Sequence, residues 1–67
     1  MNKKEMVKDL LELEEKHKRI NVFIEENKAF CDLTTRQQHL LVELRATMEV
    51  YFSSLCECID ELGAEDE

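Results

Sequence analysis

The sequence predicts an all-α protein, an antiparallel two-helix hairpin that assembles into a homo-oligomeric helical bundle. Three observations support this fold class. The 67 residues contain no proline and a single glycine, Gly63, so nothing interrupts a helical backbone until the C-terminal end. Apolar side chains recur at helical spacing in two long segments that are separated by one short polar stretch. A chain this short buries too little apolar surface to be stable alone, so self-association is expected.

We expect the whole chain, residues 1–67, to form one hairpin whose first helix covers about residues 3–28. A heptad seam runs along this helix, with a histidine at one of its positions: Met6, Leu10, Leu13, His17, Ile20 and Ile24. The pattern fades in the segment EENKAFCDL, so the loop is expected at about residues 29–34.

The second helix is expected at about residues 35–62. Thr34 or Thr35 is expected to accept hydrogen bonds from amides of the first turn, and Gln37 or Gln38 to close a capping box. The expected seam of this helix contains Leu41, Leu44, Met48, Tyr51, Leu55, Cys58 and Leu62.

The C-terminal end of the second helix is expected at Gly63. Glycine adopts without steric cost the left-handed conformation that ends many helices. Residues 63–67 are then expected to form an acidic tail beyond the helix.

Each helix carries more apolar surface than one neighbouring helix covers. The side chains that flank the two seams are Val7, Leu11, Phe23, Leu40, Phe52 and Ile59. A lone hairpin would expose them as a large apolar stripe, which is typical of an interface. We therefore expect a homodimeric four-helix bundle or a larger ring of hairpins.

The three cysteines are interpreted as packing residues. Cys56 and Cys58 point about 200° apart on a helix, so they cannot bind one metal ion or form a disulfide with each other. Cys31 lies at the loop end, roughly 37 Å from Cys56 along the hairpin. Cys58 falls on the seam and is expected to be a small core residue, whereas Cys56 lies off it and is expected to be partly exposed or at a subunit contact. No metal site and no cofactor are expected.

Composition argues against several classes of function. A net charge of −7 is unfavourable for binding DNA or RNA, because affinity for phosphate backbones needs a basic surface. No apolar stretch is long enough for a signal peptide or a membrane span, so a soluble cytoplasmic protein is expected. We find no nucleophile paired with a base and expect no enzymatic activity. His17 is interpreted as a satisfied interior histidine rather than a buried base.

One group of cationic and aromatic residues is a candidate ligand site. Folding the chain at its loop places Arg19 and Arg45 at the same level of the hairpin, with Lys16, Phe23 and Tyr51 within about two turns. Guanidinium and ammonium groups bind phosphates and aromatic rings stack on bases, so these residues suit a small nucleotide. The alternative is that the cations form surface ion pairs, and spacing alone favours it. The acidic partners would then be Glu12, Glu15, Glu43 and Glu49.

Three segments, EEKHKRINVFI, AFCDLTTRQQHLL and MEVYFSSLCECIDEL, relate the chain to a family. It resembles the small helical-hairpin proteins of bacteriophages that were first catalogued in crAss-like phages. The matching positions are Lys16, Arg19, Phe23, Ile24, Phe30, Leu33, Leu40, Leu41, Met48, Tyr51 and Ile59. The similarity extends from about Leu10 to Leu62. The chain departs from the family pattern at Leu44 and Arg45, where glutamine and leucine are expected, and at Cys58, where arginine is expected.

This resemblance implies a function. Small oligomeric hairpin proteins of phages include ones that bind and sequester the nucleotide signals of bacterial immune systems, such as cyclic dinucleotides and cyclic or conjugated ADP-ribose. We therefore expect a viral anti-defence protein that sequesters such a signal in the cytosol of a bacterial host without cleaving it. The alternative hypothesis is a homo-oligomeric helical adaptor that binds a host protein through its apolar stripe, including Phe52 and Ile59.

Overall fold

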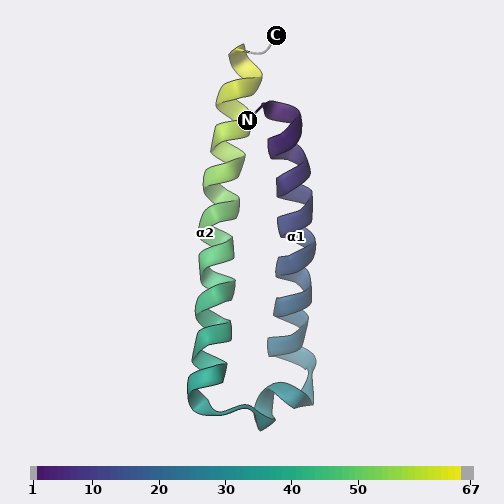
Figure 1. The fold of residues 1–67 in the computed structure, drawn as a ribbon, viewed down its shortest axis with the longest axis vertical. Helices are drawn as coiled ribbons and strands as arrows, with labels where there is room; N and C mark the ends of the chain where they lie inside the picture. The colour runs from purple at the N-terminus through teal and green to yellow at the C-terminus, as the bar shows by residue number, and fades with distance from the viewer. Residues whose placement is uncertain (1, 66–67) are drawn as a thin grey trace.

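The computed structural model describes residues 2–65, with the side chains of residues 2–63. Two long helices, α1 (Lys3–Glu26) and α2 (Thr35–Glu65), pack antiparallel and are joined by a short 3-10 helix, η1 (Lys28–Asp32) (Figure 1). No strand occurs within residues 2–65. The predicted all-α class and the helical hairpin are confirmed, and the homo-oligomeric bundle stays a prediction.

Asparagine side chains define both ends of α1. The Oδ1 atom of Asn2 accepts a hydrogen bond from the amide of Glu5 at 2.9 Å, which satisfies one of the free amides of the first turn. At the other end, the Asn27 amide donates to the carbonyl of Phe23 at 3.3 Å, while its side chain accepts from the Ala29 amide at 2.8 Å. Because Asn27 ends α1 and begins η1, α1 stops earlier than the sequence pattern indicates.

Side-chain contacts hold the connection between the two helices. The rings of Phe23 and Phe30 meet edge to face, with centroids 6.2 Å apart and planes at 86°. The side-chain amide of Gln38 donates to the carbonyl of Phe30 at 2.9 Å and to that of Leu33 at 3.3 Å. These contacts tie η1 to the first turns of α2 and so help to determine the level at which the helices face each other.

The predicted capping box of α2 is confirmed at Thr34 and Gln37. The Thr34 hydroxyl oxygen accepts from the Gln37 amide at 3.1 Å, and Oε1 of Gln37 accepts from the Thr34 amide at 2.9 Å. This reciprocal pair satisfies two amides that the helix itself leaves unpaired.

The prediction that Gly63 ends α2 is wrong. The helix continues through Gly63 to Glu65, and no glycine in the described residues has a positive φ angle. A methyl group built at Gly63 would lie 3.0 Å from Nζ of Lys3 on α1. Gly63 is therefore an interior helical residue beside the start of α1, and residues 63–65 of the expected tail are helical. Residues 66 and 67 lie outside the described part of the chain.

The seam between the helices is as predicted on α1 and shifted on α2. On α1, Leu13 is buried, and the half-buried positions are Met6, Leu10, His17, Ile20 and Ile24. On α2, four of the predicted positions, spaced seven residues apart, are buried or half-buried: Leu41, Met48, Leu55 and Leu62. The positions between them are wrong, because Leu44, Tyr51 and Cys58 are exposed whereas Arg45, Phe52 and Ile59 are half-buried. The inner face of α2 therefore follows steps of four then three rather than three then four.

Two contacts define the register of the hairpin. His17 meets Glu49, and Asn21 meets Arg45, so both pairs are symmetric about Leu33. Leu33 lies within the loop that the sequence predicts at about residues 29–34. The resulting molecule is elongated, with Cα extents of 50 × 16 × 16 Å.

Candidate functional site

Arg45 lies on one edge of the hairpin, and its charge is balanced within the chain. Its Nη1 atom donates to Oδ1 of Asn21 at 2.9 Å and to Oε2 of Glu25 at 2.8 Å. The Arg45 side chain is 21% exposed, so its aliphatic stem packs between the helices while the guanidinium reaches the surface. The structure does not bring Arg45 together with the other predicted cations, and Glu25 was not among its expected acidic partners.

His17 and Glu49 continue this edge one turn further from the loop. Nε2 of His17 donates to Oε2 of Glu49 at 2.9 Å, and the two side chains are 31% and 58% exposed. His17 therefore has a partner, as expected, but it lies at the border of the seam rather than in the interior. We call the group formed by His17, Asn21, Glu25, Arg45 and Glu49 the Arg45 edge.

An apolar depression beside the Arg45 edge was missed by the sequence analysis. It lies between the helices and is lined by Glu14, His17, Glu49 and Phe52. The shifted register of α2 creates it, because Phe52 points toward α1 instead of away from it. Carboxylates at its border make this depression unsuitable for a phosphate group.

Lys16 and Arg19 lie on the opposite edge of the hairpin. Both side chains are exposed, and neither forms an ion pair with another residue of the range 2–63. They border a second open depression whose apolar lining comes from Ile20 of α1 and from Leu44 and Met48 of α2. Two of the five predicted ligand-binding residues are thus brought together next to apolar surface.

The two predicted aromatic residues have different environments. Tyr51 is 49% exposed and lies seven residues, nearly two turns, after Leu44, so it shares the face of α2 that borders Lys16 and Arg19. Phe23 lies seven residues after Lys16 and is half-buried against Phe30. Tyr51 is therefore accessible to a ligand, whereas Phe23 mainly packs on the connection.

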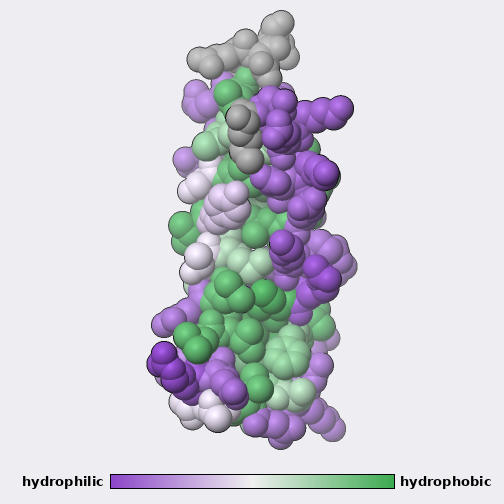
Figure 2. Space-filling view, viewed as in Figure 1, coloured by the Kyte–Doolittle hydropathy of each residue, from purple (hydrophilic) through white to green (hydrophobic). Residues whose placement is uncertain are grey.

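We call the second edge, formed by Leu40, Leu44, Tyr51 and Cys58 of α2 with Lys16 and Arg19 of α1, the Leu44 edge. Leu40, Leu44 and Tyr51 are 49%, 46% and 49% exposed, which is high for large apolar side chains on one helix face. Figure 2 shows apolar side chains gathered between the helices in the loop half of the molecule, with hydrophilic side chains along α1 above them. An exposed apolar area bordered by charges is typical of a binding surface.

The cysteines follow the shifted register. Cys58 is exposed, so its prediction as a core residue is wrong, whereas Cys56 is partly exposed, as expected. The reason is that the inner face of α2 passes through Ile59, next to Cys58. Within residues 2–63, no three histidine, cysteine or acidic side chains are grouped to hold a metal ion. Neither helix of the described chain is long and apolar enough to cross a membrane.

The chain was compared with family models, with curated proteins and with solved structures, and none of them matches it.

Proposed function

We propose that this protein binds and sequesters a nucleotide-derived signalling molecule without cleaving it, and does so as a homo-oligomer of hairpins. In this proposal it acts as a phage anti-defence protein in the cytosol of a bacterial host. The observation that supports it best is the pair Lys16 and Arg19, two exposed cations without an acidic partner in the described residues that border an apolar depression. Such a pair suits phosphate groups, and the adjoining apolar surface suits a base.

The proposed site differs from the one expected from the sequence. Arg45 is left out, because its guanidinium already donates to Asn21 and Glu25 on the other edge. Tyr51 is kept as the accessible aromatic residue, since it lies on the same edge as Lys16 and Arg19. The depression is open to solvent in a single hairpin, so a ligand bound there is covered on one side only.

The resemblance to small helical-hairpin proteins of bacteriophages is a second argument for the proposal, because small oligomeric hairpin proteins of phages include ones that sequester nucleotide signals. Sequestration needs tight binding but no chemical step, so the site requires only cations and apolar contacts. Cyclic dinucleotides, cyclic trinucleotides and ADP-ribose derivatives all combine phosphates with bases, and they form the ligand panel to test.

The test is titration calorimetry and native mass spectrometry of the full chain with this panel. The variant Lys16→Gln/Arg19→Gln should weaken binding at least about tenfold, because hydrogen bonds to charged groups contribute roughly 1.5–3 kcal/mol each. The matched control is Lys18→Gln/Arg36→Gln, which removes one exposed lysine and one exposed arginine elsewhere and should bind like the parent protein. A protein that binds no member of the panel, or variants of equal affinity, would refute the proposal.

A second candidate function is an adaptor that docks an amphipathic helix of a host protein. The observation in its favour is the exposure of Leu40, Leu44 and Tyr51 on one face of α2. Phe52 and Ile59, which the sequence suggested for this role, are half-buried in the seam, so substituting them would test the fold instead. This candidate predicts that Leu40→Glu abolishes capture of one specific host protein and that no nucleotide co-purifies.

A further inference from the structure

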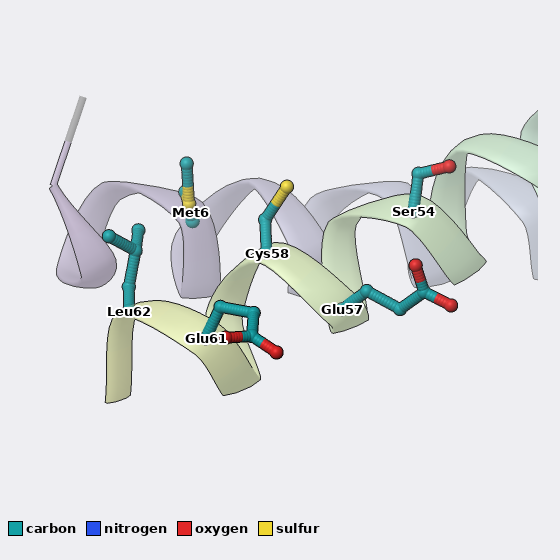
Figure 3. A pocket seen from close by; sticks show the side chains of 6 residues that line it. All are labelled: Met6, Ser54, Glu57, Cys58, Glu61 and Leu62. Carbon is teal, nitrogen blue, oxygen red and sulfur yellow. The ribbon is translucent and has the colours of Figure 1, made fainter. Parts of the chain in front are cut away.

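The Leu44 edge has a hollow at its far end as well as projecting side chains in its loop half. This hollow is a third depression, near the chain termini, and is lined by Met6, Ser54, Glu57, Cys58, Glu61 and Leu62 (Figure 3). In Figure 3, Met6 of α1 and Cys58 of α2 project toward the same side, with the carboxylates of Glu57 and Glu61 on the neighbouring turns of α2. The loop half instead presents Leu40 and Leu44, each about half exposed.

The projecting side chains and the hollow are placed symmetrically about Tyr51. Leu44 precedes Tyr51 by seven residues, and Cys58 follows it by seven. Leu40 and Leu62 are likewise equidistant from Tyr51. Seven residues span ~10.5 Å of helix, so the projecting leucine side chains and the hollow lie at equal distances on either side of Tyr51.

Charged residues on α1 show the same symmetry. Asp9, Glu12, Lys16 and Arg19 follow one another in steps of three and four, so they form one stripe along α1, with acidic residues first and cations last. The centre of this charged stripe is Glu14, from which Asp9 and Arg19 are equally distant, as are Glu12 and Lys16.

The two centres of symmetry lie at the same height. Glu14 and Phe52, which is the neighbour of Tyr51, line the same depression on the other edge of the hairpin. Consider two copies of the Leu44 edge related by a two-fold axis that is perpendicular to the helices at this level. The projecting leucines of one copy then face the hollow of the other, and the cations of one copy face the acidic residues of the other. A surface with this property is complementary to itself.

We propose that the Leu44 edge is an interface for a second copy of this chain, which lies antiparallel to the first, with the two-fold axis at Tyr51. Leu44 and Leu40 of each copy then fill the hollow at Cys58 and Leu62 of the partner subunit. Lys16 and Arg19 face Glu12 and Asp9 of the partner subunit along the α1 border. This interface goes beyond the proposed function. It uses the same cations, Lys16 and Arg19, so a nucleotide phosphate and the carboxylates of the partner subunit compete for them.

The charges of the Leu44 edge favour an antiparallel second copy of the chain, and the size of the edge is sufficient for such an interface. A parallel pairing of the same edges would not bring the acidic half of the charged stripe opposite the cationic half, whereas the antiparallel pairing does so twice. The edge runs the length of a molecule with Cα extents of 50 × 16 × 16 Å, and such a face is on the order of the ~800 Å² that each partner contributes to a standard interface.

The first test is a charge reversal measured by sedimentation equilibrium at low salt, with helicity followed by circular dichroism. Lys16→Glu/Arg19→Glu should weaken the dimer about tenfold or more, because like charges then face each other. Asp9→Lys/Glu12→Lys should do the same. The variant that carries all four changes should dimerise like the parent protein, since an antiparallel interface regains its opposite charges. Failure of the fourfold variant to restore the dimer would overturn the orientation, and a monomeric parent protein would overturn the interface.

A disulfide test keeps the proposal falsifiable if charge reversal unfolds the chain. Leu44→Cys, made together with Cys31→Ser and Cys56→Ala, should form a disulfide between position 44 and Cys58 of the partner subunit on mild oxidation, identified by peptide mass. Val50→Cys in the same background is the control, because Val50 is 68% exposed on the outer face of α2 and should remain reduced. A disulfide between the two introduced thiols, or none, would contradict the antiparallel pairing.

Discussion

The Arg45 edge and the Leu44 edge belong to the same two helices, but only one of them finds its partners within the chain. On the Arg45 edge, side chains from α1 and α2 meet in hydrogen bonds of 2.8 to 2.9 Å. On the Leu44 edge, Leu44 and Tyr51 are about half exposed, and Lys16 and Arg19 form no ion pair within residues 2–63.

This difference indicates where intermolecular contacts are to be expected. A cation that already donates to a carboxylate and an amide offers little to a ligand, and breaking those bonds would cost free energy. Exposed apolar side chains beside unpaired cations gain from any partner that covers them. The Leu44 edge is therefore distinguished from the Arg45 edge by exposed apolar side chains and by cations that form no ion pair within residues 2–63. The mere presence of arginines and aromatic rings does not distinguish them.

The largest effect is expected from Leu44→Glu. A carboxylate at the centre of the apolar part of the Leu44 edge should weaken self-association by about one hundredfold, since burying a leucine contributes roughly 1.5–3 kcal/mol and a buried unpaired charge opposes burial. Analytical ultracentrifugation checks this, with Val50→Glu as the matched control on the outer face of the same helix. Equal dimer affinities for the two variants would remove the distinction between the edges.

A smaller effect is expected from Asp9→Asn/Glu12→Gln, and it should have opposite signs for nucleotide binding and for dimerisation. In the proposed dimer these carboxylates of one subunit face Lys16 and Arg19 of the other, so a nucleotide phosphate must compete with them. Their removal should tighten nucleotide binding and weaken the dimer, each about tenfold at low salt. Calorimetry and sedimentation on one preparation measure both constants. Nucleotide affinity that falls along with dimer affinity would show instead that the dimer builds the nucleotide site.

Arg45→Met tests the other edge and should affect only the fold. It keeps the stem that packs between the helices but removes hydrogen bonds to Asn21 and Glu25, so it should lower the free energy of unfolding by about 1 kcal/mol. Urea unfolding at fixed protein concentration gives this value. Dimer and nucleotide affinities should match those of the parent protein, and a loss of nucleotide binding would return Arg45 to the ligand site.

The smallest effect is expected from His17→Gln. The pair of His17 with Glu49 is partly exposed, with side chains 31% and 58% accessible, and such pairs contribute about 0–1 kcal/mol. We expect a change of a few tenths of a kcal/mol in the free energy of unfolding. Glu49→Gln should give a similar value, because either change leaves a side chain that can form a hydrogen bond at the same place. A much larger loss in either variant would show that the Arg45 edge determines the fold more strongly than its exposure indicates.

The candidate site was only partly predictable from residue types. Lys16 and Arg19 border one depression, and Tyr51 lies on the same edge of the hairpin, but their grouping as a ligand site stays a prediction. Arg45 is expected with them because folding the chain at its loop places it at the level of Arg19. Once position 45 lies on the seam, its guanidinium emerges on the opposite edge, where Asn21 and Glu25 accept its hydrogen bonds.

The sequence by itself determined the two helices, the connection between them, the capping box at Thr34 and the seam of α1, because these depend on local propensity, local hydrogen bonds and one dominant apolar period. Only the tertiary structure decided which flank of α2 faces α1. Apolar residues occur on both flanks of α2, and steps of three and four fit the heptad in either order. In the structure, Phe52 and Ile59 pack toward α1, and Arg45 donates a hydrogen bond to Asn21 on the same flank. The opposite flank of α2, with Leu44, Tyr51 and Cys58, is therefore exposed. The tertiary structure also shows that α2 continues through Gly63, beside Lys3 of α1, although glycine often ends a helix.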